Sequence, residues 1–207
     1  MNRRTAIALA AGLAVAAVIG LAAIYAIVTD RVLVATPIAA TPSNAAGGPF
    51  ALTDGGGATV TDQTFRGKWE LVFFGYTYCP DLCPTTLGTI ADALTELGPL
   101  ASEIQPLFIT VDPQRDTPDI VGTYVKNFDP RIVGLTGSAK AIAAVTAEYK
   151  VYYAVHKTGD GRNDYLMDHS GFVYLMNPEG KFARVLSGDT SGKAMADKLR
   201  PFLSPRS

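Results

Sequence analysis

Two cysteines, Cys79 and Cys83, are the only ones in the chain and lie four positions apart in the run FGYTYCPDLCP at residues 74–84. An apolar run precedes them and a helix-like run follows. Backbone N–H groups and the dipole at a helix N-terminus stabilise thiolates, which carry out disulfide chemistry or bind soft metals. A purely structural disulfide is the weaker interpretation, because closing so short a ring contributes only about 2 kcal/mol.

The elements that must position the cysteines are visible as hydrophobic patterns. Residues 69–76 and 104–111 are nearly continuous apolar runs, which is typical of strands buried on both faces. Between them, residues 84–97 carry apolar side chains at the spacing of an amphipathic helix. A right-handed strand–helix–strand unit is therefore expected, with the cysteines where the first strand passes into the helix.

The rest of the soluble region alternates in the same way. We expect edge-hairpin strands at 50–53 and 58–61, a helix at 118–128, a strand at 132–135, a helix at 138–149 capped by Ser138, hairpin strands at 172–177 and 182–186, and a helix at 191–202. This order predicts an α/β domain with a mixed sheet flanked by helices, similar to the thioredoxin fold.

The N-terminal region has a different character. Residues 5–28 contain no charge and as a helix would extend about 36 Å, enough to cross a bilayer. Arg3 and Arg4 precede this run, so the positive-inside rule places the short N-terminal end in the cytoplasm and the rest outside. We predict a transmembrane anchor within residues 1–30, a flexible tether at 31–49 and one domain at 50–207.

Charge excludes one class of partner. From residue 35 onward the chain has 15 lysines and arginines against 18 acidic residues, a net charge of −3. Nothing in this balance resembles a basic nucleic-acid surface, so we expect no nucleic-acid partner.

Four motifs in order carry a family resemblance. They are FGYTYCPDLCP at 74–84, VDPQRDTP at 111–118, VGLTG at 133–137 and DHS at 168–170. Together they resemble the Sco/SenC family of copper chaperones, over about residues 48–202. The resemblance implies a thioredoxin-like fold, a membrane anchor with the domain on the periplasmic face, and copper bound by Cys79, Cys83 and His169. It also implies delivery to the dinuclear copper centre of cytochrome c oxidase, or to another cuproprotein.

The donor set suits copper on chemical grounds. Cu(I) is soft and prefers thiolates, whereas imidazole is accepted by both Cu(I) and Cu(II). Three protein ligands leave the coordination incomplete, which exchange between proteins requires. A disulfide between Cys79 and Cys83 would prevent loading.

His169 stands just before the strand expected at 172–176, where thioredoxin-like oxidoreductases carry a cis-proline facing the cysteines. A ligand role is therefore favoured over a solvated imidazole. Asp168 could orient its ring, or could be a solvated turn residue. Asp112 follows a buried strand, and either supports the cysteines or bonds nearby backbone N–H groups.

Other residues near the expected ligands are assigned roles in packing or on the surface rather than in metal binding. Met167 is expected to pack in the core, and His156 to lie on the surface beside an exposed loop at 157–164. Arg115 and Asp116 are interpreted as an ion pair within a loop.

Three other functions remain open. In a thiol–disulfide oxidoreductase, Cys79 and Cys83 would be the catalytic pair, acting on an oxidase subunit or another extracytoplasmic partner. Three residues between the cysteines and a histidine opposite them favour copper instead. A peroxidase fits less well because Thr77 stands two residues before Cys79 rather than three, and two cysteines with a histidine could also hold zinc.

Overall fold

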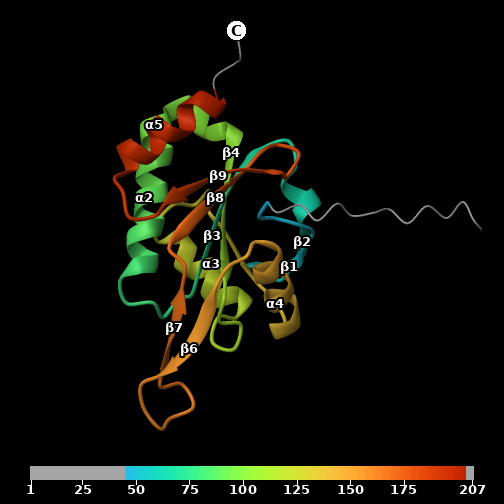
Figure 1. Ribbon diagram of the computed structural model, residues 1–207, viewed down its shortest axis with the longest axis vertical. Coiled ribbons are helices and arrows are strands. Elements are labelled where there is room, and N and C mark those ends of the chain that lie inside the picture. Colours follow the sequence, from blue (N-terminus) through green and yellow to red (C-terminus); the bar gives the residue numbers. More distant parts are fainter. Residues whose placement is uncertain (1–44, 204–207) are drawn as a thin grey trace, which may run out of the picture. The chain divides into compact units, whose positions relative to one another are not determined.

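The computed structural model describes residues 45–203 (Figure 1). Within this range no helix has both the length and the apolar character needed to span a bilayer. The predicted anchor at 5–28 lies outside the described residues, as does most of the tether. The division into anchor, tether and domain therefore stays a prediction.

A seven-stranded mixed sheet forms the centre of the domain, with strand order β2-β1-β5-β4-β3-β8-β9. The strands are β1 (Ala51–Asp54), β2 (Thr59–Thr61), β3 (Trp69–Gly75), β4 (Ile104–Thr110), β5 (Val133–Thr136), β8 (Phe172–Met176) and β9 (Phe182–Ser187). β3, β4 and β5 run parallel, whereas β8 and β1 pair antiparallel with this group. The mixed sheet and the β1–β2 edge hairpin confirm the predictions.

β3 and β4 occupy the middle of the sheet because their side chains are apolar on both faces. Phe73 and Phe74 are fully buried, although they point to opposite sides of the strand. In register, Phe73 pairs with Phe108 of β4 and with Val173 of β8. β3 is thus held between two buried strands, and its carboxyl end, where the cysteine run begins, pairs with β4.

Helices cover the sheet. They are α2 (Leu82–Leu97), α3 (Pro118–Lys126), α4 (Ala139–Glu148) and α5 (Gly192–Leu203), with short 3-10 helices η1 (Asp62–Phe65) and η2 (Gly98–Glu103). α2 begins two residues before the expected start and packs against α5 (Figure 1). Ser138 caps α4 as predicted, since its hydroxyl accepts a hydrogen bond of 3.1 Å from the N–H of Ala141.

A second hairpin was not predicted. β6 (Tyr153–Lys157) and β7 (Tyr165–His169) pair antiparallel as a separate two-stranded sheet, which projects from the body of the domain (Figure 1). The expected exposed loop at 157–164 is wrong in extent, because Lys157 still belongs to β6. The hairpin was missed because β6 is largely exposed, Val155 to 60%, and so lacks the apolar run of a buried strand. His156 lies exposed on β6, as expected.

Candidate metal centre

The cysteines follow the carboxyl end of β3. Gly75 ends that strand, and a Cβ there would lie 2.6 Å from Sγ of Cys83 and 2.9 Å from the Phe108 ring. Only glycine therefore lets α2 approach the strand this closely. Cys79 lies in the turn before α2 and is partly exposed, whereas Cys83 lies in the first turn and is fully buried.

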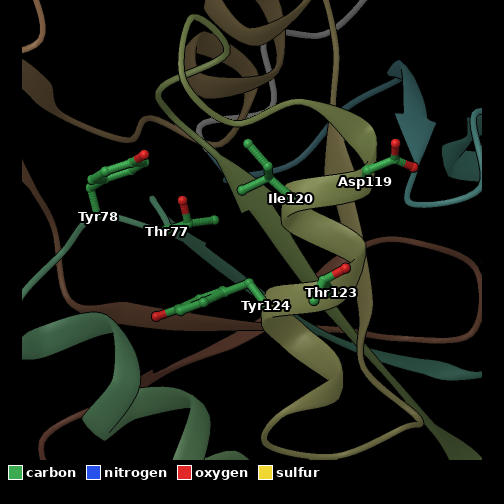
Figure 2. A pocket seen from close by; sticks show the side chains of 6 residues that line it. All are labelled: Thr77, Tyr78, Asp119, Ile120, Thr123 and Tyr124. Carbon is green, nitrogen blue, oxygen red and sulfur yellow. The ribbon is translucent and has the colours of Figure 1, made fainter.

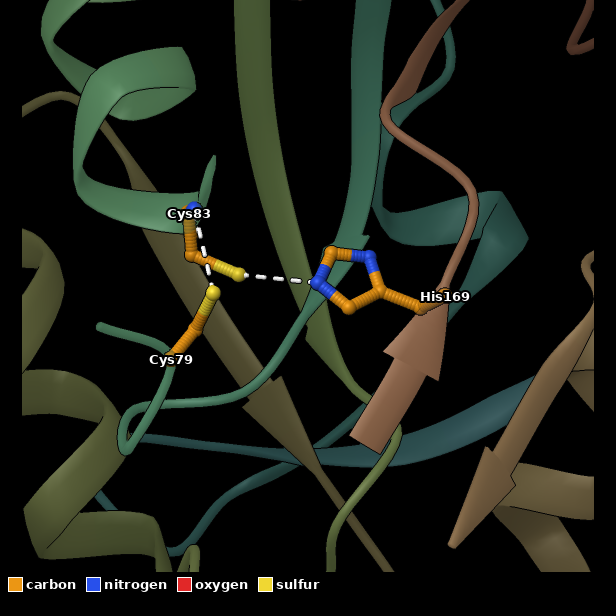
Figure 3. Close-up of side chains that lie close together, drawn as sticks. All are labelled: Cys79, Cys83 and His169. Carbon is orange, nitrogen blue, oxygen red and sulfur yellow. Dashed lines mark hydrogen bonds between the residues drawn. The ribbon is translucent and has the colours of Figure 1, made fainter. Parts of the chain in front are cut away.

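His169, the last residue of β7, completes a compact cluster of donors (Figure 3). Its Nε2 lies 3.2 Å from Sγ of Cys83, and the backbone N–H of Cys83 donates to Sγ of Cys79 at 3.4 Å. The three donor atoms all lie within 4.8 Å of one another. Sulfur and nitrogen ligands typically stand about 2.0–2.3 Å from a metal ion, so small side-chain movements would let all three bind one ion.

The ring of His169 is held in place from two sides. Its Nδ1 lies 3.2 Å from the carbonyl oxygen of Ser170, so the tautomer protonated on Nδ1 would donate to that carbonyl and leave the Nε2 lone pair for a metal ion. Phe73 and Tyr76 meet the ring edge-on, with centroid distances of 6.1 and 5.8 Å. Asp168 is exposed, and within residues 45–203 no hydrogen bond joins it to the ring. The Ser170 carbonyl, rather than Asp168, therefore orients the imidazole.

The two cysteines differ in proton affinity. The pKa of Cys79 is lowered to about 3, chiefly because the Cys83 thiol donates a hydrogen bond to its thiolate, with His169 and backbone N–H groups adding to the effect. Burial raises the pKa of Cys83 well above that of an ordinary thiol. The metal-free centre thus holds a thiolate at the partly exposed position and a thiol at the buried one.

Asp112 faces the hairpin rather than the cysteines. Its buried carboxylate accepts hydrogen bonds from Nε of Arg115 at 2.5 Å and from the Tyr165 hydroxyl at 2.8 Å. The expected ion pair between Arg115 and Asp116 is therefore wrong, since Arg115 pairs with Asp112. Sequence proximity could not separate the two neighbouring acids, because both fall within reach of the arginine.

Asp116 has a different task, which sequence reasoning missed. Its carboxylate accepts hydrogen bonds from the N–H of Thr77 at 3.0 Å and from the hydroxyls of Thr77 and Thr110, both at 2.5 Å. Thr77 stands two residues before Cys79, so this buried acid anchors the loop that carries the cysteine. The only sequence signal was its place in the motif VDPQRDTP at 111–118.

An open groove of about 520 Å³ lies beside the cysteine loop (Figure 2). It is lined by Thr77, Tyr78, Asp119, Ile120, Thr123 and Tyr124. The side chains of Tyr78 and Ile120 are 59% and 40% exposed. Because Tyr78 directly precedes Cys79, the groove lies beside the loop that carries this cysteine. Met167, by contrast, is buried in the core as predicted.

Comparison with known proteins places these features in a wider group. Residues 38–204 match the protein family described as SCO1/SenC. The mitochondrial protein SCO2 of Saccharomyces cerevisiae is 41% identical over 159 residues, which cover 76% of this chain and 53% of that protein. The chain therefore spans about half the length of this relative.

Solved structures agree with the sequence match. The structure of Bradyrhizobium japonicum ScoI with copper bound superposes with a TM-score of 0.71 at 43% identity, covering 76% of this chain and 99% of that one. Yeast Sco1 with copper bound gives a TM-score of 0.72 at 36% identity, covering 79% and 91%. Both similarities lie well above the level at which only the fold would be shared.

Proposed function

The chain belongs to the SCO1/SenC family, and from this premise we propose that it is a copper metallochaperone that holds one copper ion on Cys79, Cys83 and His169. The observation that carries the proposal is the convergence of two sulfurs and one imidazole nitrogen, from elements far apart in the sequence, within 4.8 Å. Relatives at 43% and 36% identity whose structures contain bound copper support it.

Loading follows from the protonation states of the ligands. Cys79 is already a thiolate and can receive copper directly. Cys83 must lose its proton before it can bind, so copper displaces that proton to solvent. His169 would bind through Nε2, which lies 3.2 Å from Sγ of Cys83, with the ring proton on Nδ1 beside the carbonyl oxygen of Ser170.

Release depends on an incomplete coordination shell. Three protein ligands leave room for a donor from a partner, and Cys79 is the more accessible sulfur, on the loop whose Thr77 and Tyr78 line the groove. We propose that the receiving partner is the copper-binding subunit of cytochrome c oxidase, or another cuproprotein. The family resemblance supports the oxidase.

The site can be tested by titrating the reduced full-length chain, in mild detergent, with Cu(I) and with Cu(II) against calibrated chelators. One tight site is expected, lost in Cys79→Ser and Cys83→Ser. His169→Ala should weaken Cu(II) binding most, because soft Cu(I) can remain on two thiolates. His156→Ala is the matched control, since it removes the only other histidine, which is exposed on β6. Unchanged affinities in all three site variants would refute the proposal.

Membrane attachment is the second part of the proposal. The uncharged residues 5–28 would anchor the chain, with the domain on the periplasmic, extracytoplasmic face. Membrane fractionation of the full chain and of a chain beginning at Ala45 tests this. The full chain should sediment with membranes and the shorter one should remain in the supernatant with its copper site intact; equal partitioning of the two would contradict the anchor.

A second candidate is a thiol–disulfide oxidoreductase, favoured by the thiolate of Cys79. That thiolate would attack a partner disulfide and form a mixed disulfide, and the deprotonated sulfur of Cys83 would then displace the partner's second thiolate. The partner gains two electrons and Cys79–Cys83 becomes a disulfide. A disulfide-bonded peptide incubated with the reduced chain distinguishes the candidates. Rapid reduction that is unaffected by His169→Ala, combined with weak copper binding, would favour this activity.

A further inference from the structure

His169 and the cysteines are carried by separate parts of the domain. The cysteines lie between β3 and α2, at the central sheet, whereas His169 ends β7 of the two-stranded hairpin. Ser170 and Gly171 join His169 to β8 of the central sheet, which fixes its position from one side. The hairpin itself pairs with no strand of that sheet, so its orientation depends on side-chain contacts with the body of the domain.

Arg115 supplies a dense set of such contacts. Its Nη1 donates hydrogen bonds to the carbonyl oxygens of Tyr165 at 2.9 Å and Asn163 at 3.2 Å, where β7 begins. Its Cζ lies 3.6 Å from the centroid of the Tyr165 ring, which is a stacking distance. The Tyr165 hydroxyl in turn donates to Asp112, the same carboxylate that Arg115 binds.

The same guanidinium also faces the cysteine loop. Its Cζ lies 4.9 Å from the centroid of the Tyr78 ring and 5.7 Å from that of Tyr76. Tyr78 directly precedes Cys79. The Tyr76 ring meets His169 edge-on, with the centroids 5.8 Å apart and the planes at 90°. Arg115 thus stands between the loop that carries one ligand and the strand that carries another.

From these contacts we propose that Arg115 is a positioning residue that sets His169 against the cysteines, and thereby determines how tightly the centre holds Cu(II) relative to Cu(I). The inference rests on the proposed copper site. The side chain of Arg115 is only 7% exposed and that of Asp112 3%. A buried ion pair of this kind is weak evidence for stability, so we assign it a positional role here. Lysine keeps the charge but cannot reproduce the planar fork or the stacking.

The expected selectivity arises because the cysteines have an anchor of their own. Asp116 holds Thr77, and the cysteine pair is braced by α2, so both sulfurs stay in place when the hairpin shifts. Cu(I) can remain on two thiolates. Cu(II) depends more strongly on the imidazole nitrogen, and so on the hairpin.

The test compares Arg115→Lys with Arg131→Lys in the reduced full-length chain. Arg131 also pairs with an aspartate, Asp129, with an N–O distance of 2.6 Å, but its side chain is 44% exposed and it precedes β5, at the opposite end of the parallel strands from the cysteines. Arg115→Lys should weaken Cu(II) binding about 10- to 100-fold, the range typical of groups that orient metal ligands. Cu(I) affinity should change by less than about threefold, well below the effect expected for Cu(II). In the electron paramagnetic resonance spectrum of bound Cu(II), the coupling to nitrogen should diminish. Arg131→Lys should alter neither affinity.

A copper-free readout separates this inference from the copper proposal. Amide hydrogen exchange should accelerate in β6 and β7 of Arg115→Lys, while β3 and α5 keep wild-type rates. If Arg115→Lys fails to fold, Tyr165→Leu removes the stacked ring and should give the same pattern. An equal loss of Cu(I) and Cu(II) affinity, or unchanged Cu(II) affinity and hairpin exchange, would overturn the inference. A wild-type chain that binds no copper would refute the proposed function instead, and hairpin exchange alone would then decide the role of Arg115.

Discussion

Alkylation of Cys79 by iodoacetamide should be almost independent of pH between pH 5 and 8. Only the thiolate reacts, and the hydrogen bond from the Cys83 thiol lowers the pKa of Cys79 from 9.0 to about 3. Cys79 is therefore fully ionised throughout this range. An ordinary thiol would react about ten times faster for each unit of pH, because its thiolate fraction is still rising.

The size of the effect combines ionisation with nucleophilicity. At pH 5 an ordinary thiol with a pKa of 9.0 is only about 0.01% ionised, against nearly complete ionisation of Cys79. A thiolate also becomes less nucleophilic as its pKa falls, and with a Brønsted coefficient of about 0.45 a drop of about six units costs about 500-fold. Cys79 should therefore react about 20-fold faster than an ordinary thiol at pH 5 and about 5-fold slower at pH 7.

Mass spectrometry of digested, reduced full-length chain measures the rate at each cysteine. Cys83 should react far more slowly because it is fully buried. Two substitutions at Cys83 test the cause: Cys83→Ser keeps a hydrogen-bond donor and should preserve the flat profile, whereas Cys83→Ala removes it and should raise the pKa of Cys79. A wild-type rate that climbs tenfold per pH unit, or equal profiles in the two variants, would refute the reasoning.

Two further predictions concern buried acids. Asp116→Asn should lower the free energy of unfolding by about 1–3 kcal/mol in denaturant titrations, because the amide group turns a donor toward the donors of Thr77 or Thr110. Asp119→Asn, at an exposed position of α3, is the control. Equal losses of stability in the two variants would contradict the anchoring role of Asp116. Burial raises the pKa of Glu70 from 4.5 to about 7, so the folded state keeps a proton that the unfolded state has lost, and stability should fall by up to about 3 kcal/mol between pH 4.5 and 7. Glu70→Gln should flatten this dependence, and an unchanged pH profile would show that Glu70 is not its source.

The parts of the fold that the sequence predicts well are those whose burial leaves a continuous pattern. β3 and β4 are apolar on both faces because they lie at the middle of the sheet, and α2 shows helical spacing because one side packs inward. The cysteines were located for the same reason, since they sit at the junction of two such patterns. His169 was placed by its position ahead of β8, which lies beside β3.

The features that sequence reasoning missed depend on contacts between residues far apart in the chain. β6 is exposed, so its pairing with β7 has no apolar signature, and the prediction of a loop followed from polarity alone. The run from Asp112 to Asp116 holds one arginine between two aspartates, and local spacing allows either pair. The choice is made by Tyr165, whose hydroxyl and carbonyl engage Asp112 and Arg115, and by Thr77, which binds Asp116. These partners lie 39 to 53 residues away, so only the folded chain assigns one acid to the hairpin and the other to the cysteine loop.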